Sequence, residues 1–254
     1  MGKKARRYSP NATQQTDNVV SLNYHDQQAR LHGPKKKNWS IHDLHNVTPL
    51  TEKQEDMFHA WFQGDDICAH GSAGTGKSFL SLFLACSEML DRGEHDRIII
   101  IRSAVQGRDM GHLPGSLEEK YAEYEAPYQA ILSDLFGRKS TYADMKEAGK
   151  IEFMTTSFIR GLTFDNAIII LDEFQNCTFA EIDSVMTRVG KNSRVLVAGD
   201  DKRQCDLRHH EETGSNRMIS AFKKMGEFST IEFNTEDVVR SAYAKSWLLA
   251  TGQA

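Results

Sequence analysis

A chain of 254 residues can bury one substantial core, and this length fits one or two domains. Its net charge of −4 is uneven: residues 1–45 hold eight Lys/Arg and three Asp/Glu (+5), which leaves 23 basic and 32 acidic residues (−9) elsewhere. No apolar stretch approaches the roughly 20 residues of a membrane span, and no hydrophobic region follows the N-terminal charges as in a secretory signal. The four cysteines lack disulfide or zinc spacing, so we expect a reduced, cytoplasmic setting without a membrane partner.

The first part of the chain, residues 1–46, is polar and basic, and it offers few apolar residues for a core. We expect a flexible arm there, with the folded domain at residues 47–254. The run Lys35, Lys36 and Lys37 predicts a contact with nucleic acid, because clustered lysines attract phosphates. A solubilising tail without a binding role is the alternative.

Residues from Thr51 predict a helix, with Thr51 as its cap and Gln54 at its third position. The Gln54 side chain either completes a capping box or recognises adenine, since it lies shortly before a phosphate-binding loop.

That loop is the segment Gly71 to Ser78, Gly-Ser-Ala-Gly-Thr-Gly-Lys-Ser, which fits the pattern G-x-x-x-x-G-K-[ST]. Glycines let the backbone curl around phosphates with its N–H groups inward, Lys77 supplies a positive charge, and Ser78 offers a hydroxyl to Mg²⁺. An apolar strand precedes the loop and an apolar helix follows it. We therefore predict a nucleoside-triphosphate site, with these binding residues: Gln54, Gly71, Ser72, Ala73, Gly74, Thr75, Gly76, Lys77, Ser78 and Phe79.

Further along, apolar strand patterns alternate with helical ones, which predicts an α/β fold: a doubly wound, mainly parallel sheet with helices on both faces. The predicted strands after the loop are 97–102, 151–155, 167–171, 194–198 and 229–233. The predicted helices are 117–136, 139–148, 178–189, 215–225 and 236–250. Tyr121, Tyr124 and Tyr128 fall at helical spacing, and we expect them to pack in the core.

Acidic residues follow two of these strands. Asp172 ends the run Ile168–Leu171, where it can hold Mg²⁺ together with Ser78, and the adjacent Glu173 is placed to polarise the attacking water. Asp200 comes two residues after the strand 194–198, and Gln204 in the following loop is a candidate sensor of the γ-phosphate. The second acid beside Asp172 favours hydrolysis over phosphorylation of a small molecule.

These motifs together resemble the PhoH-like ATPases, single-core relatives of the superfamily-one helicases, from about Pro49 to the C-terminus. The similar segments are 71–78, 111–115, 160–163, 171–176, 187–190 and 237–240. The resemblance implies a RecA-like P-loop NTPase fold that binds ATP and Mg²⁺ and acts on RNA. It implies that Gln175 links hydrolysis to nucleic acid and that Arg102 contacts nucleic acid, although Ser103 replaces the family's usual proline. The sequence also departs from the family spacing between Asp200 and Gln204.

Two functions follow. The first is ATP hydrolysis coupled to RNA or single-stranded nucleic acid; the alternative is a nucleotide-gated binding or scaffold protein with little turnover. A single core lacks the second helicase domain that delivers an arginine to the nucleotide, so we expect a homo-oligomeric ring, a hexamer, in which a neighbour supplies it. Arg188 and Arg240 are the two candidates.

Overall fold

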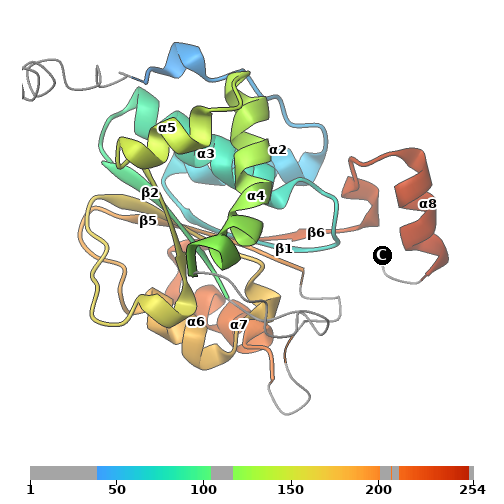
Figure 1. The fold of residues 1–254 in the computed structure, drawn as a ribbon. Helices are drawn as coiled ribbons and strands as arrows, with labels where there is room; N and C mark the ends of the chain where they lie inside the picture. The colour runs from blue at the N-terminus through green and yellow to red at the C-terminus, as the bar shows by residue number, and fades with distance from the viewer. Residues whose placement is uncertain (1–38, 104–116, 201–206, 208–211, 252–254) are drawn as a thin grey trace, which may run out of the picture. The chain divides into compact units, whose positions relative to one another are not determined.

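The computed structural model describes residues 39–103, 117–200, 207 and 212–251, without the side chains of 117–120. Its centre is a six-stranded sheet in the order β3-β2-β4-β5-β1-β6, in which every neighbouring pair is parallel (Figure 1). The strands are β1 (Asp66–Gly71), β2 (Arg97–Arg102), β3 (Ile151–Thr155), β4 (Ala167–Asp172), β5 (Arg194–Ala198) and β6 (Phe228–Phe233). All six predicted strands are confirmed.

Helices cover both faces of the sheet (Figure 1). One face packs against α2 (Glu52–Gln63), α3 (Lys77–Asp91), α4 (Leu117–Phe136) and α5 (Thr141–Glu147). The other packs against α6 (Phe179–Met186) and α7 (Ser215–Met225). Successive strand residues point to opposite faces, so Ile98 and Ile100 join the first core and Ile99 and Ile101 the second. The doubly wound α/β prediction is confirmed.

The helix predicted over 236–250 is present, but it begins at Ala242 and not at residue 236. A short 3-10 turn, η4 (Thr235–Asp237), is followed by extended chain and then by α8 (Ala242–Ala250). The interruption has a physical cause: the Val239 N–H donates to the Gly74 carbonyl at 3.1 Å, so this segment bonds to another loop instead of continuing a helix. The Ser241 hydroxyl then accepts from the Ala244 N–H and starts α8.

The predicted boundary at residue 46 also differs from the structure. The 3-10 turn η1 (Ile41–Asp43) already belongs to the packed domain. The Trp39 ring meets that of Phe136 edge-on at 5.3 Å, and the His45 N–H donates to the Leu135 carbonyl at 2.8 Å. These residues close over the end of α4, so the core extends before residue 47.

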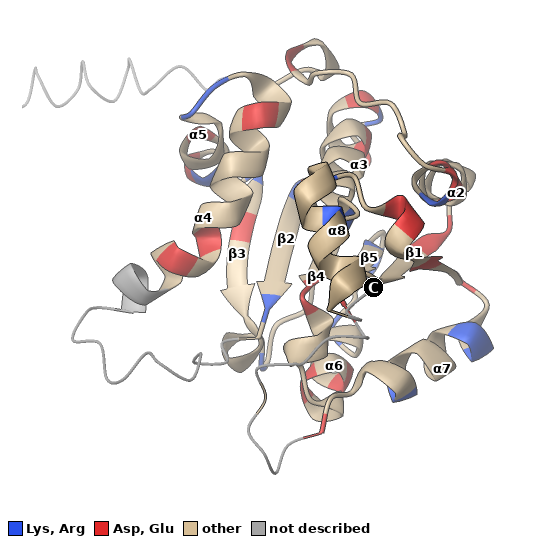
Figure 2. Cartoon of the chain, turned by 90° about the vertical axis from the view of Figure 1, so that its right-hand side faces the viewer, with Lys and Arg blue, Asp and Glu red and all other residues tan. Residues whose placement is uncertain are grey.

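Charges of both signs are interspersed over the domain. Figure 2 shows acidic residues along α4 and on β3 and α6, with basic ones along α7 and at the carboxyl end of β2. Within residues 39–103, 117–200 and 212–251, no helix has the length and apolar character needed to cross a bilayer.

Candidate nucleotide-binding site

The phosphate loop connects β1 to α3, and its shape depends on glycine. Gly71 has a φ of +106°, and a Cβ there would lie 2.1 Å from the Phe233 carbonyl oxygen of the neighbouring strand. The next residue, Ser72, donates its N–H to that oxygen at 2.9 Å. Only glycine allows this close backbone approach together with a positive φ. The loop is thereby fixed to β6 where β1 ends.

Lys77 lies within this loop and is only 8% exposed. Its Nζ donates to the carbonyl oxygens of Gly71 at 3.0 Å and Ser72 at 2.7 Å. The Thr75 hydroxyl donates to the Ser72 carbonyl at 3.1 Å and closes the turn. These bonds hold the ammonium group at the start of α3, where a helix N-terminus also favours anions.

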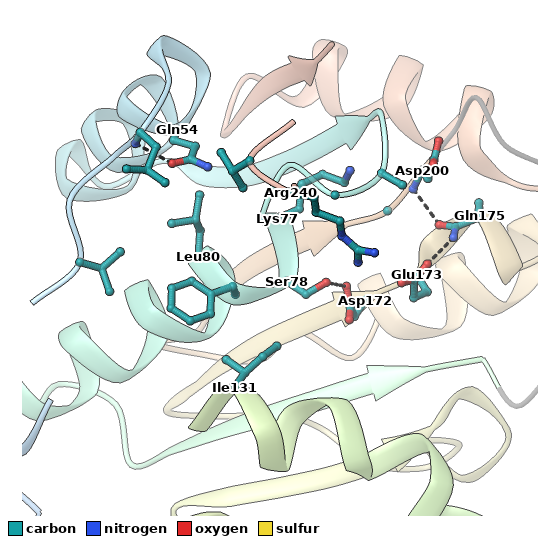
Figure 3. A pocket seen from close by; sticks show the side chains of 18 of the residues that line it. Gln54, Lys77, Ser78, Leu80, Ile131, Asp172, Glu173, Gln175, Asp200 and Arg240 are labelled. Carbon is teal, nitrogen blue, oxygen red and sulfur yellow. Dashed lines mark hydrogen bonds between the residues drawn. The ribbon is translucent and has the colours of Figure 1, made fainter. Parts of the chain in front are cut away.

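Asp172 is buried at the carboxyl end of β4. The Ser78 hydroxyl donates to its Oδ1 at 2.8 Å, which joins the two predicted metal ligands (Figure 3). Burial, with the charge of Glu173 as a second cause, raises the pKa of Asp172 to about 6. Hydrogen bonds from Ser78 and Tyr128 and the charge of Arg102 act in the opposite direction. The site thus concentrates negative charge beside a hydroxyl oxygen, a donor set that suits Mg²⁺.

Glu173 has left-handed backbone angles, φ +53° and ψ +44°, which are uncommon for a residue with a long side chain. Its Oε2 accepts a hydrogen bond from the Gln175 Nε2, and the Gln175 Oε1 accepts from the Asp200 N–H at 2.9 Å. Gln175 therefore bridges the acids that follow β4 and β5 (Figure 3). Strained backbone of this kind clusters at functional sites, where neighbouring contacts hold it in place.

Arg240 reaches the phosphate loop from the extended segment before α8. Its side chain covers Gly74, where an added Cβ would lie 3.0 Å from the Arg240 Cδ. Figure 3 shows its guanidinium extending toward Asp172. The chain therefore places one of its own arginines at the site.

Gln54 is 3% exposed and contacts the loop from α2. Its Nε2 donates to the Thr75 carbonyl at 2.9 Å, and its Oε1 accepts from the Leu50 N–H at 2.8 Å. The Thr51 hydroxyl caps α2 as predicted by accepting from the Gln54 N–H. However, the Gln54 side chain does not close a capping box and instead joins the start of α2 to the phosphate loop.

These groups face one cavity of about 710 Å³, a volume typical of small-molecule sites. One end is apolar and suits a base; it is lined by Val47, Leu50, Phe79, Leu80, Ile131 and Val239. The other end is polar. The predicted residues that line the cavity are Gln54, Ala73, Gly74, Gly76, Lys77, Ser78, Phe79, Arg102, Asp172, Glu173, Gln175, Asp200 and Arg240.

Arg188 lies elsewhere. Its Nε donates to the Ile159 carbonyl at 2.7 Å and its Nη1 to the Ser184 carbonyl at 2.6 Å, so the side chain ties the end of α6 to the chain after η2 (Thr156–Phe158). It is not among the residues that line the cavity. Gln204 and the lysines 35, 36 and 37 are outside the described residues.

Two side chains have roles that the sequence did not predict. Tyr128, predicted to pack, does pack in the core at 1% exposure, but its hydroxyl also donates to the Asp172 Oδ2 at 2.9 Å. Arg102, predicted to contact nucleic acid, lines the cavity, with its guanidinium 5.6 Å from the Tyr124 ring centroid. The helical spacing of the tyrosines predicted that they pack in the core, but spacing alone does not tell which hydroxyl group contacts an acidic residue.

Solved structures share the general fold at low similarity. A large terminase from a thermophilic bacteriophage, in complex with ADP, is 12% identical, with a TM-score of 0.46 over 78% of this chain and 49% of that one. The Pif1 helicase from Candida albicans is 15% identical, with a TM-score of 0.36 over 74% and 40%. Scores this low carry no argument about function.

Sequence relatives are much closer. Protein PhoH of Escherichia coli strain K12 is 35% identical over 213 residues, which cover 82% of this chain and 60% of that protein. A PhoH-like protein of Bacillus subtilis strain 168 is 36% identical over 196 residues, 77% of this chain and 60% of that one. The chain thus spans about 60% of the length of these curated relatives. A family model described as PhoH-like protein matches residues 46–251, and the chain belongs to this family.

Proposed function

We propose that this protein is a Mg²⁺-dependent ATP hydrolase whose turnover is coupled to RNA or single-stranded nucleic acid. The observation that supports hydrolysis best is the content of a single cavity: a phosphate loop, the acid pair Asp172 and Glu173, and Arg240. Binding alone needs only the loop. The acid pair and the arginine are the groups that phosphoryl transfer to water requires in addition.

In this proposal the triphosphate of ATP lies on the loop and on Lys77, while the adenine ring enters the apolar end of the cavity. Gln54 holds the phosphate loop in place by donating a hydrogen bond to the Thr75 carbonyl. Ser78 and Asp172 hold Mg²⁺; the bound ion supplies positive charge that neutralises phosphate oxygens. The pair fits this ion because its two oxygens already lie 2.8 Å apart, beside a second carboxylate.

Glu173 orients the attacking water and accepts its proton. Gln175 fixes the position of the Glu173 carboxylate and connects it to Asp200, the residue that follows β5. A movement of Asp200 can therefore change the position of the catalytic base, Glu173, through the single side chain of Gln175. This path supports the coupling of hydrolysis to nucleic acid that the family resemblance implies for Gln175.

Arg240 stabilises the charge that develops on the γ-phosphate, and it does so from within the same chain. We predicted a hexameric ring because a neighbouring subunit would have to supply this arginine. Since Arg240 of the same chain lines the cavity, that argument for a ring no longer applies. The hexamer itself stays a prediction, which light scattering at working concentration tests. Arg188 stays a candidate to act on a neighbouring subunit, and mixing Arg188→Ala with Lys77→Ala subunits tests it: recovered activity supports the shared site.

The basic run Lys35 to Lys37 is proposed as a sequence-independent tether. For single strands, each neutralised phosphate contributes about −0.7 to the slope of log affinity against log salt. Removing residues 1–38 should flatten this slope while ATP hydrolysis without RNA is unchanged.

The decisive experiment compares Glu173→Gln with Lys77→Ala. The first keeps the shape and the acceptor for Gln175 but loses the base, so ATP should bind normally while turnover falls by about 10²–10⁴-fold. The second removes a phosphate contact and should weaken binding as well. Rates are measured by phosphate release with and without single-stranded RNA and DNA, and affinities with a fluorescent ATP analogue.

Wild-type turnover in Glu173→Gln would contradict the proposed base. ATP binding by the unmodified protein without hydrolysis, with or without nucleic acid, would favour the scaffold alternative.

A further inference from the structure

Asp172 is held from two sides. On one side, the Ser78 hydroxyl donates to Oδ1 at 2.8 Å; on the other, the Tyr128 hydroxyl donates to Oδ2 at 2.9 Å. Tyr128 belongs to α4, which is distant in sequence from both the phosphate loop and β4. Both ends of this bond are inaccessible, with Tyr128 1% and Asp172 3% exposed. Water therefore cannot easily replace the tyrosine as a donor.

The Tyr128 ring itself packs on Phe153 at 5.9 Å, which fixes where its hydroxyl points. The hydroxyl therefore donates to the carboxylate of Asp172 in a fixed direction.

Arg102 adds positive charge on the same side. Its guanidinium lies over the Tyr124 ring, 5.6 Å from the ring centroid, and its side chain lines the same cavity as Asp172. From α4, Tyr128 thus occupies the outer oxygen of the acid, Oδ2. The inner oxygen, Oδ1, is left for Ser78 and the proposed cation.

We propose that Tyr128 is a positioning residue for the Mg²⁺ site: by binding Oδ2 it fixes the Asp172 carboxylate so that Oδ1 stays beside Ser78. This inference rests on the proposed function, because it assumes that Asp172 holds Mg²⁺. Hydrogen-bonding partners of this kind orient ligating carboxylates, and their loss costs about 10–100-fold in metal affinity or activity.

The test is the substitution Tyr128→Phe, which removes one oxygen and keeps the ring against Phe153. We expect the Mg²⁺ concentration for half-maximal binding of a fluorescent ATP analogue to rise about 10–100-fold. Affinity for the same analogue in EDTA should stay within about twofold, because the phosphate loop is intact. Mn²⁺ binding to the protein–nucleotide complex, followed by electron paramagnetic resonance, gives a direct metal readout.

Tyr121→Phe is the matched control. It removes the same atom from the same helix, and its ring lies against Phe153 and Phe158, away from the acids. It should leave the Mg²⁺ dependence unchanged. A second control combines Tyr128→Phe with Asp172→Asn: the tyrosine change should add little once the carboxylate is gone, because the two residues act as a unit.

An unchanged Mg²⁺ dependence in Tyr128→Phe, or an equal shift in Tyr121→Phe, would overturn the proposal. If Tyr128→Phe does not fold, 3-fluorotyrosine at position 128 keeps the hydroxyl, and its ¹⁹F resonance should shift when Mg²⁺ joins the bound nucleotide, whereas position 121 should not respond; no shift at 128 would overturn the proposal. Failure of the unmodified protein to bind nucleotide at all would instead contradict the proposed function.

Discussion

Buried charges occur at both ends of the sheet, and the two ends treat them differently. At the amino end, Glu88 and Arg194 are 3% and 13% exposed in their side chains and form an ion pair between Arg194 Nη1 and Glu88 Oε2. Arg194 also donates to the carbonyls of Trp61 and Asp65, and its guanidinium lies 3.4 Å from the Trp61 ring centroid. At the carboxyl end, Asp172 and Glu173 place like charges side by side.

The arrangement of charges at the amino end favours stability, whereas the arrangement at the carboxyl end suits the proposed function. The amino end pairs opposite charges and gives the Arg194 guanidinium two backbone acceptors, although its Nε has no hydrogen-bond partner among the described residues; such pairing makes a buried ion pair tolerable. The carboxyl end sets the charges of Asp172 and Glu173 side by side and holds Glu173 in a left-handed backbone conformation, both of which cost folding free energy. A site that must bind a cation and take up a proton needs that arrangement. Breaking the Glu88–Arg194 pair should therefore lower the free energy of unfolding, whereas neutralising Asp172 should raise it.

The largest effect is expected from Arg194→Met, which removes the arginine partner of buried Glu88 and leaves it only His95, whose Nδ1 lies 3.1 Å from Glu88 Oε1. Breaking a buried ion pair in this way costs about 3–5 kcal/mol of unfolding free energy. Denaturant unfolding measures it, with Arg97→Met as the control. Arg97 pairs with Glu152 at 3.1 Å, but both side chains are about one third exposed (34% and 31%).

Exposed pairs of this type contribute about 0–1 kcal/mol, so the control should lose little. Arg194 does not line the nucleotide cavity. Arg194→Met should accordingly keep its ATP affinity at temperatures where it is folded. If Arg194→Met lost no more stability than Arg97→Met, the buried Glu88–Arg194 pair would not stabilise the fold, and the proposed contrast between the two ends would be wrong.

The opposite effect is expected from Asp172→Asn. It removes a buried charge that lies beside the like charge of Glu173, keeps an oxygen for Ser78 and offers an amide N–H to the Tyr128 oxygen. We expect the free energy of unfolding at pH 8 to rise by about 1–2 kcal/mol while hydrolysis is lost. Asp183→Asn, on the exposed face of α6, controls for the loss of a carboxylate and should stay within about 0.5 kcal/mol. Destabilisation by Asp172→Asn would contradict the comparison.

The sequence predicted well what short segments encode. The phosphate loop and the Asp172–Glu173 pair are each contiguous, and strand patterning placed them at one edge of the sheet. All six strands follow from runs of apolar residues because parallel strands are buried on both faces. Family resemblance added Gln175 and Arg240, whose positions no local pattern determines.

What the sequence did not predict depends on contacts between distant segments. Tyr128 of α4 bonds to Asp172 of β4 across 44 positions of the chain, and Arg102 lines the same cavity as the two acids. The helix predicted over 236–250 breaks because Val239 bonds to Gly74, a contact between segments far apart in the chain that periodicity cannot reveal. Helical spacing therefore identified the helix of Tyr128 but not its partner.

A third effect, no larger than that of Asp172→Asn, concerns Asp66, the first residue of β1, which lies at the amino end near Arg194. Burial raises the pKa of Asp66 to about 6, although the Val195 N–H donates to its Oδ1 at 2.8 Å and the charge of Arg194 acts in the opposite direction. The folded protein therefore binds more protons than the unfolded chain between about pH 4 and pH 6. Stability should fall as pH rises through this window and remain lowered above it.

Asp66→Asn keeps the acceptor for Val195 without the charge, so its advantage over the unmodified protein should be absent below about pH 4 and complete above about pH 6. One pKa unit corresponds to about 1.4 kcal/mol, and partial exposure of Asp66 reduces the expected gain to about 1–2 kcal/mol. Unfolding by urea from pH 4 to pH 8 measures the difference, and Asp56→Asn, with a side chain 46% exposed, controls for loss of a surface carboxylate. A difference that does not change with pH would mean that Arg194 already compensates Asp66, and the amino end would then pair all of its charges.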